Sequence, residues 1–325
     1  MATVRVETSK SYDIIISAGL LQNAGEHIRN AVGGTKAAII TDDIVDALYA
    51  ETLKRTLSGA GYEVYKFVFP NGECSKNPLN FLKILDYLAE NGFTRRDVTV
   101  ALGGGVVGDI AGFAAASYMR GMRLVQVPTT LLAAVDSSVG GKTGIDLKAG
   151  KNLAGAFYQP DLVLCDYLTL GTLKEDVFRA GCAEVIKYGV ISNALLFESL
   201  KEPIKNRLEE VIARCVEIKR DVVAQDEREG GLRQILNFGH TFGHAIELLS
   251  DYKTPHGEAV AIGMAMMARS CARLGICSDK TAGSIIDMIK RYNLPVETGY
   301  PAEYIYKAAL SDKKMGGGEI TLVVP

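Results

Sequence analysis

Three of the chain's four histidines fall between residues 240 and 256. His240 and His244 stand one helical turn apart in LNFGHTFGHAIE, and His256 opens HGEAVAIGM. Imidazoles gathered in this way suit borderline metals such as zinc. Thr241 follows His240, so the HExxH pattern of metalloproteases is absent and that class is disfavoured. The alternative is a set of hydrogen-bonded core histidines without a metal.

Glu184 is the best candidate for a carboxylate ligand beside these histidines. A catalytic metal often takes a third protein ligand of this type. In AGCAEVIKYG the residue lies in an otherwise apolar helical segment, with Lys187 one turn later. A buried carboxylate and a buried amine are costly unless they are paired or bound to a metal. Both a metal site and an intrahelical salt bridge between Glu184 and Lys187 account for this pattern.

The segment RQILNFGHTFGHAIE carries a polar stripe at helical spacing. Arg233, Asn237, His240, His244 and Glu247 follow one another at steps of three or four, which places them on one face of a helix predicted over residues 232–249. A solvated face would usually carry Lys and Glu. A guanidinium on this face is suited to bidentate binding of a carboxylate or a phosphate.

The segment VTVALGGGVVGDIAGFAA indicates a strand, a glycine turn and a helix. Glycines let a backbone approach a ligand, and a helix N-terminus offers free N–H groups to an anion. Gly103, Gly105 and Gly108 satisfy the letters of GxGxxG, but no acidic residue lies ~20 positions further on, so the dinucleotide fingerprint is incomplete. A tight turn without a ligand is the alternative.

A second stretch rich in small residues is VPTTLLAAVDSSVGGKTGID. Lys142 follows two glycines and could hold a phosphate as a point charge. The P-loop frame fails because Asp136 stands where its first glycine is required, which disfavours ATP chemistry of that type. A polar loop without a ligand is the alternative.

The elements that must position these residues change character along the chain. Short apolar runs at 4–6, 14–16, 37–40, 64–68, 98–102 and 124–127 alternate with helical patterns such as 45–57, 79–88 and 107–116. This alternation predicts a mostly parallel sheet covered by helices. From about residue 174 helical periodicity dominates, at 178–191, 208–223, 232–249, 258–274 and 281–292, and only 320–324 resembles a strand. We therefore predict a domain boundary near residue 172.

Composition limits the function classes. The 325 residues are 48% hydrophobic with a net charge of -2, which is typical of a globular protein of about two domains. This charge balance disfavours nucleic-acid and membrane partners. The N-terminus lacks the apolar core of a signal peptide, and no apolar stretch is long enough to span a bilayer. The six cysteines form no CxxC pair, so we expect buried free thiols and a cytoplasmic protein.

Several long motifs resemble one family. GGGVVGDIAGFAAASYMRG, VPTTLLAAVDSSVGGKTGID, GCAEVIKYG, DEREGGLRQILNFGHTFGHAIE and HGEAVAIGM together are similar to the 3-dehydroquinate synthase family, a branch of the sugar-phosphate cyclases, from about Asp42 to Lys314. The resemblance implies an α/β protein with an N-terminal Rossmann-like NAD-binding domain over 1–172. A mostly α-helical domain that binds metal and substrate follows over 173–325.

The resemblance also implies a reaction. The enzyme would be a carbon-oxygen lyase of the shikimate pathway that uses NAD and one divalent metal ion, Zn or Co. It would convert 3-deoxy-D-arabino-heptulosonate 7-phosphate to 3-dehydroquinate and phosphate through transient oxidation by NAD, phosphate elimination, re-reduction, ring opening and aldol closure. Alternatives are another sugar-phosphate cyclase, a metal-dependent polyol dehydrogenase and a non-catalytic binding protein. Retention of Arg233 with Leu236 and Asn237 argues for a substrate that bears a carboxylate.

Site residues follow from the resemblance position by position. Glu184, His240 and His256 match the metal ligands, and His244 matches an acid/base group, with Lys142, Lys187 and Glu184 also in the catalytic set. The positions that match substrate-binding residues are Asp136, Lys142, Asn152, Lys187, Lys219, Arg233, Asn237, His244 and Lys314 or Lys313. Those that match NAD-binding residues are Asp42, Glu73, Lys76, Gly104, Gly105, Val106, Asp109, Thr129, Thr130, Ser137, Lys151, Thr169, Thr172 and Leu173. Arg120 matches an arginine that reaches a neighbouring subunit's site, which implies a homodimer.

Two features depart from the family pattern. The chain is shorter than expected, with the difference at its C-terminal part. Ile44 stands where a polar residue often holds the adenosine ribose, which affects the expected cofactor contacts and not the chemistry.

Overall fold

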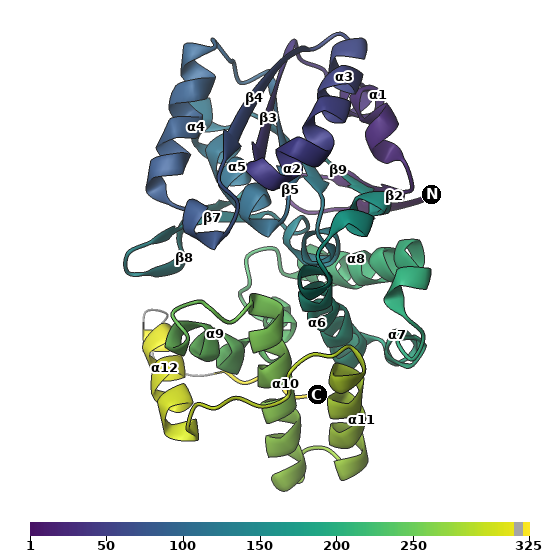
Figure 1. The fold of residues 1–325 in the computed structure, drawn as a ribbon, viewed down its shortest axis with the longest axis vertical. Coiled ribbons are helices and arrows are strands. Elements are labelled where there is room, and N and C mark those ends of the chain that lie inside the picture. Colours follow the sequence, from purple (N-terminus) through teal and green to yellow (C-terminus); the bar gives the residue numbers. More distant parts are fainter. Residues whose placement is uncertain (315–320) are drawn as a thin grey trace. The chain divides into compact units, whose positions relative to one another are not determined.

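The chain divides into two compact units. The computed structural model describes residues 1–314 and 321–325, and the side chains of all of these except 311–314. The first unit comprises Met1–Leu173 and Ile212–Arg228, and the second comprises Lys174–Val211 and Glu229–Pro325 (Figure 1).

A seven-stranded sheet forms the centre of the first unit. Its strands are β1 (Ala2–Val6), β2 (Tyr12–Ser17), β3 (Lys36–Asp42), β4 (Glu63–Phe69), β5 (Val98–Gly103), β6 (Arg123–Pro128) and β9 (Leu162–Asp166). They are arranged in the order β1-β2-β9-β6-β5-β3-β4. β1 and β2 are antiparallel and the other neighbours are parallel. The mostly parallel sheet predicted from the sequence is confirmed, and β9 is the strand that the apolar runs did not indicate.

The strand order contains a switch point. From β3 the chain goes to β4 on one side, whereas β5, β6 and β9 follow one another on the other side. The connections after β3 and β5 therefore leave neighbouring strands in opposite directions. In doubly wound sheets the crevice at the carboxyl ends of two such strands is where ligands bind.

Helices cover both faces of this sheet (Figure 1). α1 (Ala24–Val32) and α3 (Glu51–Gly59) pack on one face, and α4 (Pro78–Glu90) and α5 (Gly105–Ser117) pack on the other. Along β3, Ile39 joins the first apolar cluster while Ala38 and Ile40 join the second. Residues that alternate along a strand point to opposite faces, so a strand buried on both faces is apolar throughout. β5 follows this rule, because all of its residues are buried and most of them are apolar.

A β-hairpin begins at the end of the second stretch rich in small residues, for which a polar loop was one alternative, and a short helical segment, Ala133–Ser137, precedes it. β7 (Lys142–Leu147) pairs with β8 (Gly150–Phe157). Ile145 enters the sheet's apolar core, and the Thr143 side chain packs on α5. A Cβ on Gly112 would lie 2.5 Å from Thr143 Cγ2, so the glycine makes this contact possible. The glycines of this region therefore serve close packing as well as any ligand.

Shorter helical segments complete the first unit. They are α2 (Asp43–Val45) and the segments Leu20–Asn23, Asp46–Ala50, Glu73–Ser75, Tyr118–Arg120, Ala133–Ser137 and Tyr167–Thr172. α8 (Leu208–Gln225) supplies most of the segment 212–228. After α8, Glu227 accepts hydrogen bonds from Ser9 N and from Gln159 Nε2, at 2.9 and 2.8 Å. These bonds tie the end of this segment to the N-terminal part of the chain.

The second unit is helical in its described residues. It contains α6 (Glu175–Ser192), α7 (Ala194–Ser199), α9 (His240–Leu249), α10 (His256–Arg273), α11 (Asp279–Arg291) and α12 (Ala302–Lys314), with short helices at Ile204–Asn206 and Leu232–Asn237. α10 packs against α6, α9 and α11, so it is the central helix of this unit. The predicted strand at 320–324 is wrong for residues 321–325, which are irregular, and residue 320 lies outside the described part. In the described chain no helix is both long and apolar enough to cross a membrane.

The single helix predicted over 232–249 is also wrong. Leu232–Asn237 is a 3-10 helix, Gly239 has a φ of 80°, and α9 begins at His240. The break has a packing cause: a Cβ on Gly239 would lie 2.8 Å from Val260 O, and one on Gly263 would lie 2.0 Å from Gly239 O. α10 thus approaches the backbone so closely at this point that only glycine fits. Arg233 and Asn237 therefore do not share a helix face with His240.

The cysteines are free thiols. Cys165, Cys182, Cys215 and Cys271 are buried, as expected, whereas Cys74 is exposed and Cys277 is half-buried.

Candidate metal centre and nucleotide site

Glu184, His240 and His256 converge in the second unit. Glu184 lies in the middle of α6, and the two histidines are the first residues of α9 and α10. His240 Nε2 and His256 Nε2 are each 3.4 Å from Glu184 Oε1. The three ligand atoms lie within 4.8 Å of one another. Two imidazoles and one carboxylate are a donor set that suits a catalytic zinc or cobalt ion, with positions left over for a substrate.

Glu184 is ionised although it is buried. Its side chain is 2% exposed, and its other oxygen forms an ion pair with Lys187, which is 1% exposed. Burial alone would raise the pKa of this carboxyl, but Lys187 and His240 outweigh it and hold the pKa well below its usual range. The intrahelical salt bridge and the cluster with the histidines are thus both present, on different oxygens of one carboxylate.

The two histidines differ in charge. Burial lowers the pKa of His240 to about 4, so its imidazole is neutral at pH 7 and keeps a lone pair for a metal. Its Nδ1 lies 3.2 Å from Phe238 O, a carbonyl that accepts a hydrogen bond from the protonated nitrogen and leaves Nε2 as the donor atom. Burial also acts to lower the pKa of His256, but hydrogen bonds to Glu184 and Glu247 outweigh it and raise the pKa to about 10.

Glu247 has a role that sequence reasoning missed. It was noticed as part of the polar stripe, but no partner was assigned to it. In the structure its Oε2 lies 3.0 Å from His256 Nδ1, and its side chain is 4% exposed. A carboxylate behind a metal-binding imidazole orients the ring and makes the other nitrogen more basic. Its position one helix away from His256 could not be read from spacing.

His244 lies beside this cluster and is exposed. Its ring centroid is 5.5 Å from that of His240 and 5.9 Å from that of His256. His244 also forms a second ligand-capable group with Glu247 and His256. Geometry therefore allows His244 two roles, as a ligand or as a proton-transfer group within reach of whatever the first cluster binds.

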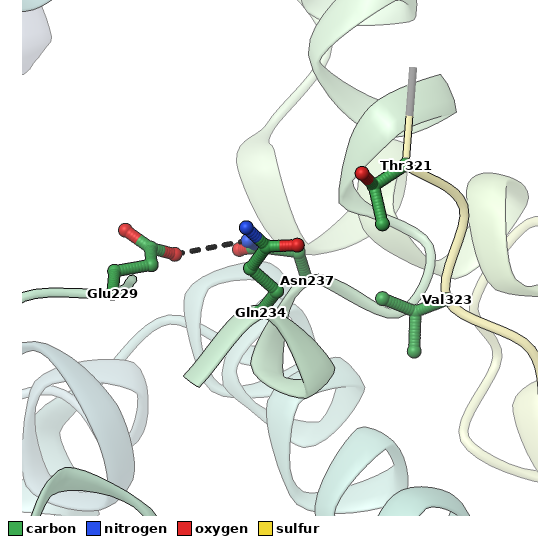
Figure 2. A pocket seen from close by; sticks show the side chains of 5 residues that line it. All are labelled: Glu229, Gln234, Asn237, Thr321 and Val323. Atoms are coloured by element: carbon green, nitrogen blue, oxygen red, sulfur yellow. Dashed lines mark hydrogen bonds between the residues drawn. The ribbon is translucent and has the colours of Figure 1, made fainter. Parts of the chain in front are cut away.

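The predicted anion-binding residues of the second unit lie just before α9. Arg233 is 1% exposed on the 3-10 helix Leu232–Asn237, and Asn237 Nδ2 donates to Glu229 Oε1 at 2.9 Å. A pocket of about 270 Å³ lies here, lined by Glu229, Gln234, Asn237, Thr321 and Val323. Figure 2 shows these side chains. Lys187 is in α6 with Glu184, and Lys313 and Lys314 lie outside the described side chains.

Four further predicted substrate residues lie in the first unit. Lys219 is 5% exposed, and its Nζ donates to Asp136 O at 2.7 Å and pairs with the Asp136 carboxylate. Lys142 begins β7 and is exposed. Asn152 is on β8 with a φ of 55°, and its N–H donates to Asp146 Oδ1 at 2.8 Å. The structure brings Lys219 and Asp136 together directly.

The glycine loop lies at the carboxyl end of β5, beside the switch point. Gly104 caps α5 with no side-chain cap, so the first N–H groups of this helix are left for another acceptor. A Cβ on Gly104 would lie 3.0 Å from Thr130 Cγ2, and one on Gly105 would lie 3.2 Å from Ser137 Oγ. Thr129 Oγ1 is buried and has no hydrogen-bond partner among the described residues. These five predicted cofactor positions form one cradle with an unsatisfied polar atom, which fits a phosphate-bearing ligand.

Four other predicted cofactor residues meet around Lys76. Its Nζ lies 3.0 Å from Asp109 and 3.5 Å from Glu73, and Lys151 Nζ lies 3.6 Å from Glu73. Burial alone would lower the pKa of Lys76, but Asp109, Glu73 and Asp146 raise it above its usual range. Asp146, 3.9 Å from Lys76 Nζ, was missed because nothing in GKTGID marks it apart from a polar strand residue.

The remaining predicted cofactor residues follow the carboxyl ends of strands, whereas Arg120 lies just before the start of β6. Asp42 ends β3 and accepts hydrogen bonds from Ile44 N and Val45 N at 3.0 and 2.9 Å. Thr169 and Thr172 follow β9. The Tyr49 hydroxyl donates to Thr169 O at 3.0 Å and lies 2.6 Å from Thr172 Oγ1. Val106 is in the first turn of α5, and Leu173 follows Thr172. Arg120 ends the turn after α5, where it is exposed with a φ of 63°.

Two sequence families cover most of the chain. The family described as 3-dehydroquinate synthase N-terminal matches residues 66–180, and the one described as 3-dehydroquinate synthase C-terminal matches residues 181–315. The chain belongs to the 3-dehydroquinate synthase family. This membership confirms the resemblance inferred from the motifs.

Relatives in the 3-dehydroquinate synthase family match along nearly their whole length. The 3-dehydroquinate synthase of Pelobacter propionicus is 48% identical over 326 residues, which cover 96% of this chain and 90% of the relative. That of Clostridium acetobutylicum is 45% identical over 332 residues, which cover 100% of this chain and 93% of the relative.

Several solved structures share the fold of this chain. A 2-deoxy-scyllo-inosose synthase complexed with carbaglucose-6-phosphate, NAD⁺ and Co²⁺ has a TM-score of 0.88 at 27% identity, and the match covers 98% of this chain and 89% of that one. A 2-epi-5-epi-valiolone synthase from Streptomyces hygroscopicus with NAD⁺ and Zn²⁺ bound has a TM-score of 0.89 at 29% identity and covers 99% and 92%. A probable glycerol dehydrogenase from Sinorhizobium meliloti has a TM-score of 0.63 at 17% identity over 91% of this chain and 88% of that one, which is a likeness of fold alone.

Proposed function

We propose that this member of the 3-dehydroquinate synthase family converts 3-deoxy-D-arabino-heptulosonate 7-phosphate to 3-dehydroquinate and phosphate. The observation that carries the proposal is the cluster of Glu184, His240 and His256 in a chain that is 45 to 48% identical to 3-dehydroquinate synthases. The buried Arg233, on the 3-10 helix that precedes α9, supports a substrate that bears a carboxylate.

The cofactors we propose are NAD and one divalent metal ion, zinc or cobalt. Two structural neighbours that carry NAD⁺ with Co²⁺ or Zn²⁺ support this choice. The metal would be held by Glu184, His240 and His256, and the NAD pyrophosphate by the Gly104–Gly105 turn with Thr129 and Thr130. When bound, NAD supplies a reversible hydride acceptor, and the metal supplies a Lewis acid that polarises a ring hydroxyl.

Other residues of the chain would bind the substrate and move protons. The His244 imidazole is exposed beside the cluster and can exchange a proton with the substrate, which is the role of a general acid/base. Arg233 offers a rigid fork of N–H groups to a carboxylate or phosphate, and the Asn237 amide can bind a hydroxyl. We assign substrate binding also to Asp136, Lys142, Asn152, Lys187, Lys219 and Lys314, and the remaining NAD contacts to Asp42, Glu73, Lys76, Val106, Asp109, Ser137, Lys151, Thr169, Thr172 and Leu173.

We propose that residues 1–172 form the NAD-binding domain and residues 173–325 the domain that binds metal and substrate. A cytoplasmic homodimer, with Arg120 contributed to the partner's site, completes the proposal.

A coupled assay tests the proposed reaction. Purified protein with NAD and zinc or cobalt should release inorganic phosphate from the heptulosonate phosphate with no net formation of NADH. A chelator should stop phosphate release, and added metal should restore it. A polyol dehydrogenase would accumulate NADH. A cyclase for substrates without a carboxylate would release phosphate from a hexose 6-phosphate. Either result would replace our proposal.

Metal content separates the proposed roles of the histidines. His256→Ala should lose the metal, because one of three ligands is removed. His244→Ala should retain it and lose turnover. Equal loss of metal in both variants, measured by elemental analysis after gel filtration, would mean that His244 belongs to the ligand set.

A further inference from the structure

A second cavity lies in the helical unit and includes none of the residues assigned to catalysis, cofactor or substrate. It has a volume of about 300 Å³, within the range of pockets that hold small ligands. Its walls come from the start of α6, from residues 200–205 after α7, and from the end of α11. The lining residues are Glu175, Phe178, Arg179, Cys182, Leu200, Lys201, Pro203, Ile204, Lys205, Arg291, Tyr292 and Asn293.

The lining is positively charged. It contains Arg179, Lys201, Lys205 and Arg291, against Glu175 as the one acidic residue that lines it. Burial raises the pKa values of both Cys182 and Tyr292 to about 12, so neither adds negative charge at pH 7. The cavity therefore favours an anion.

Existing ion pairs cancel part of this charge, since Arg179 pairs with the half-buried Glu258 at 2.9 Å, whereas Lys201 and Lys205 pair with exposed carboxylates. Lys205 pairs with Glu175 at 2.5 Å, and Lys201 pairs with Glu198, but these two carboxylates are 73% and 60% exposed. Pairs between exposed groups contribute little and exchange readily with other ions. Arg291 NH1 donates to the Lys201 carbonyl at 3.2 Å, which uses only part of its guanidinium.

Arg179 adds an unsatisfied donor. Its NH2 donates to Glu258 Oε1 at 2.9 Å, whereas its Nε is buried without a hydrogen-bond partner in the described part of the chain. A buried donor without an acceptor costs free energy, which a ligand with an acceptor oxygen would recover.

The rest of the wall is apolar and well anchored. Phe178, Leu200 and Ile204 are buried, and Lys205 Nζ lies 4.9 Å from the centroid of the Phe178 ring. Tyr292 OH donates to Leu200 O at 2.9 Å, which ties the end of α11 to the segment after α7. An apolar wall faced by cations suits a molecule with a flat apolar ring at one end and an anionic group at the other.

We propose that this cavity binds a small monocyclic aromatic carboxylate, with the ring against Phe178 and Ile204 and the carboxylate held by the cationic side chains. Three features carry the inference together: the volume, the excess of basic lining residues, and the apolar wall beside them. A phosphate-bearing sugar would match the charge and leave the apolar wall unused.

Calorimetry on the full chain tests the proposal with benzoate as the probe. Benzyl alcohol has the same ring without the charge, and acetate has the charge without the ring. Benzoate should bind saturably with one site per chain, and each analogue should bind at least about fivefold more weakly. Failure of benzoate to bind, or equal binding of benzoate and acetate, would overturn the proposal.

Variants locate the binding. Lys205→Gln and Arg291→Gln should each weaken benzoate binding about fivefold, since each removes a charge from the lining. Lys307→Gln, which removes an exposed cation paired with Glu303 elsewhere in the same unit, is the matched control and should leave binding unchanged. Binding of wild-type affinity in both variants would mean that benzoate binds elsewhere. Phosphate release from the heptulosonate phosphate is measured separately, so failure here leaves the proposed function untouched.

Discussion

At the scale of single residues, the metal cluster depends on side chains that touch one another across helices. Glu247 is the clearest case, because its carboxylate contacts Nδ1 of His256, whereas Nε2 of the same ring lies near Glu184. Its negative charge holds a proton on His256 Nδ1 and orients the ring so that Nε2 faces Glu184.

Replacement of Glu247 should weaken metal binding. Glu247→Ala removes the acceptor behind His256, so we expect metal affinity to fall about 10- to 100-fold. Glu247→Gln keeps an acceptor oxygen and loses the charge, and should lie between Ala and wild type. Competition with a metal-binding dye measures the affinity, and Glu303→Gln, an exposed acid on α12, is the control. An alanine variant within twofold of wild type would exclude this positioning role.

From the sequence, site residues could be predicted where a residue type is unusual in its own segment. Glu184 stood out because a carboxylate in an apolar helix needs a partner, and the histidines stood out because they are few and close together. The pairing of Glu247 with His256, and of Asp146 with Lys76, could not be predicted. Each joins separate elements, and neither residue is unusual in its own segment.

At the scale of elements, close backbone contacts set the spacing between the helices that carry the ligands. A Cβ on Gly257 would lie 2.0 Å from Ala180 O and 2.7 Å from Ala180 Cα. Gly257 follows His256 on α10, and Ala180 lies one turn before Glu184 on α6. The distance between these two helices is thus limited by a glycine beside the cluster.

Gly257→Ala should separate α6 from α10 and disturb the cluster. We expect a loss of about 1–3 kcal/mol in the free energy of unfolding, as for other overpacked contacts, together with weaker metal binding. Urea unfolding and metal titration provide the two measurements. Gly283→Ala on α11 is the matched control, since a Cβ there meets nothing within 4 Å, and it should be neutral or stabilising. Equal behaviour of the two variants would contradict this account of the helix contact.

Asp97 fixes the start of β5 through hydrogen bonds to its carboxylate. It accepts from Lys36 N at 2.9 Å and from Thr94 N and Oγ1 at 2.8 Å each. Burial acts to raise its pKa, but these bonds outweigh it and lower the pKa below the usual value. A lowered pKa means that the stabilisation is fully present above the unfolded-state value of about 3.9 and is lost as the pH falls through the folded-state value.

Asp97→Asn should therefore destabilise the protein in a pH-dependent way. At pH 7 we expect a loss of about 1–3 kcal/mol, because an amide cannot accept all of these bonds. The gap between variant and wild type should narrow as the pH is lowered past about 4, when the wild-type carboxyl also becomes protonated. Urea unfolding at a series of pH values measures the gap. A gap that stays constant with pH would show that Asp97 acts through its shape and not its charge.

Periodicity predicted most elements and failed where tertiary contact overrode it. The strands β1 to β6 and the helices α4, α6, α10 and α11 lie close to the predicted ranges, because each has a regular apolar pattern. The helix predicted over 232–249 is interrupted, since the contact between Gly239 and α10 imposes a left-handed residue that no local pattern reveals.

At the scale of the whole molecule, the assignment of α8 shows why unit boundaries are hard to read from a sequence. Residues 212–228 belong with the first unit although they follow two helices of the second. The bonds from Ser9 and Gln159 to Glu227 join positions more than sixty residues apart, at sequence separations of 218 and 68. Composition and periodicity are alike in α8 and in its helical neighbours, so they carry no information on this pairing.

The proposed homodimer predicts complementation between two inactive variants. If Arg120 serves the partner's site, co-expressed Arg120→Ala and His244→Ala chains should regain about a quarter of wild-type activity. Random pairing gives half mixed dimers, and each of these has one complete site. Phosphate release from the co-purified mixture is the measurement. Co-expressed His244→Ala and His256→Ala, which damage the same site, are the control, and activity no higher than this control would rule out a shared site.

Gly239, whose backbone is in the left-handed region, divides the polar stripe into two segments. Arg233 and Asn237 stand on one side of it, and His240 and His244 on the other. A continuous helix would have fixed the positions of the proposed substrate-binding and metal-binding residues relative to one another. A change in either set would then shift the other. Because Gly239 packs closely against α10, we expect α9 to keep its alignment when the segment 232–237 is exchanged for that of a relative. Substrate specificity and metal chemistry could thus be changed separately, by protein engineering or by natural divergence within the fold.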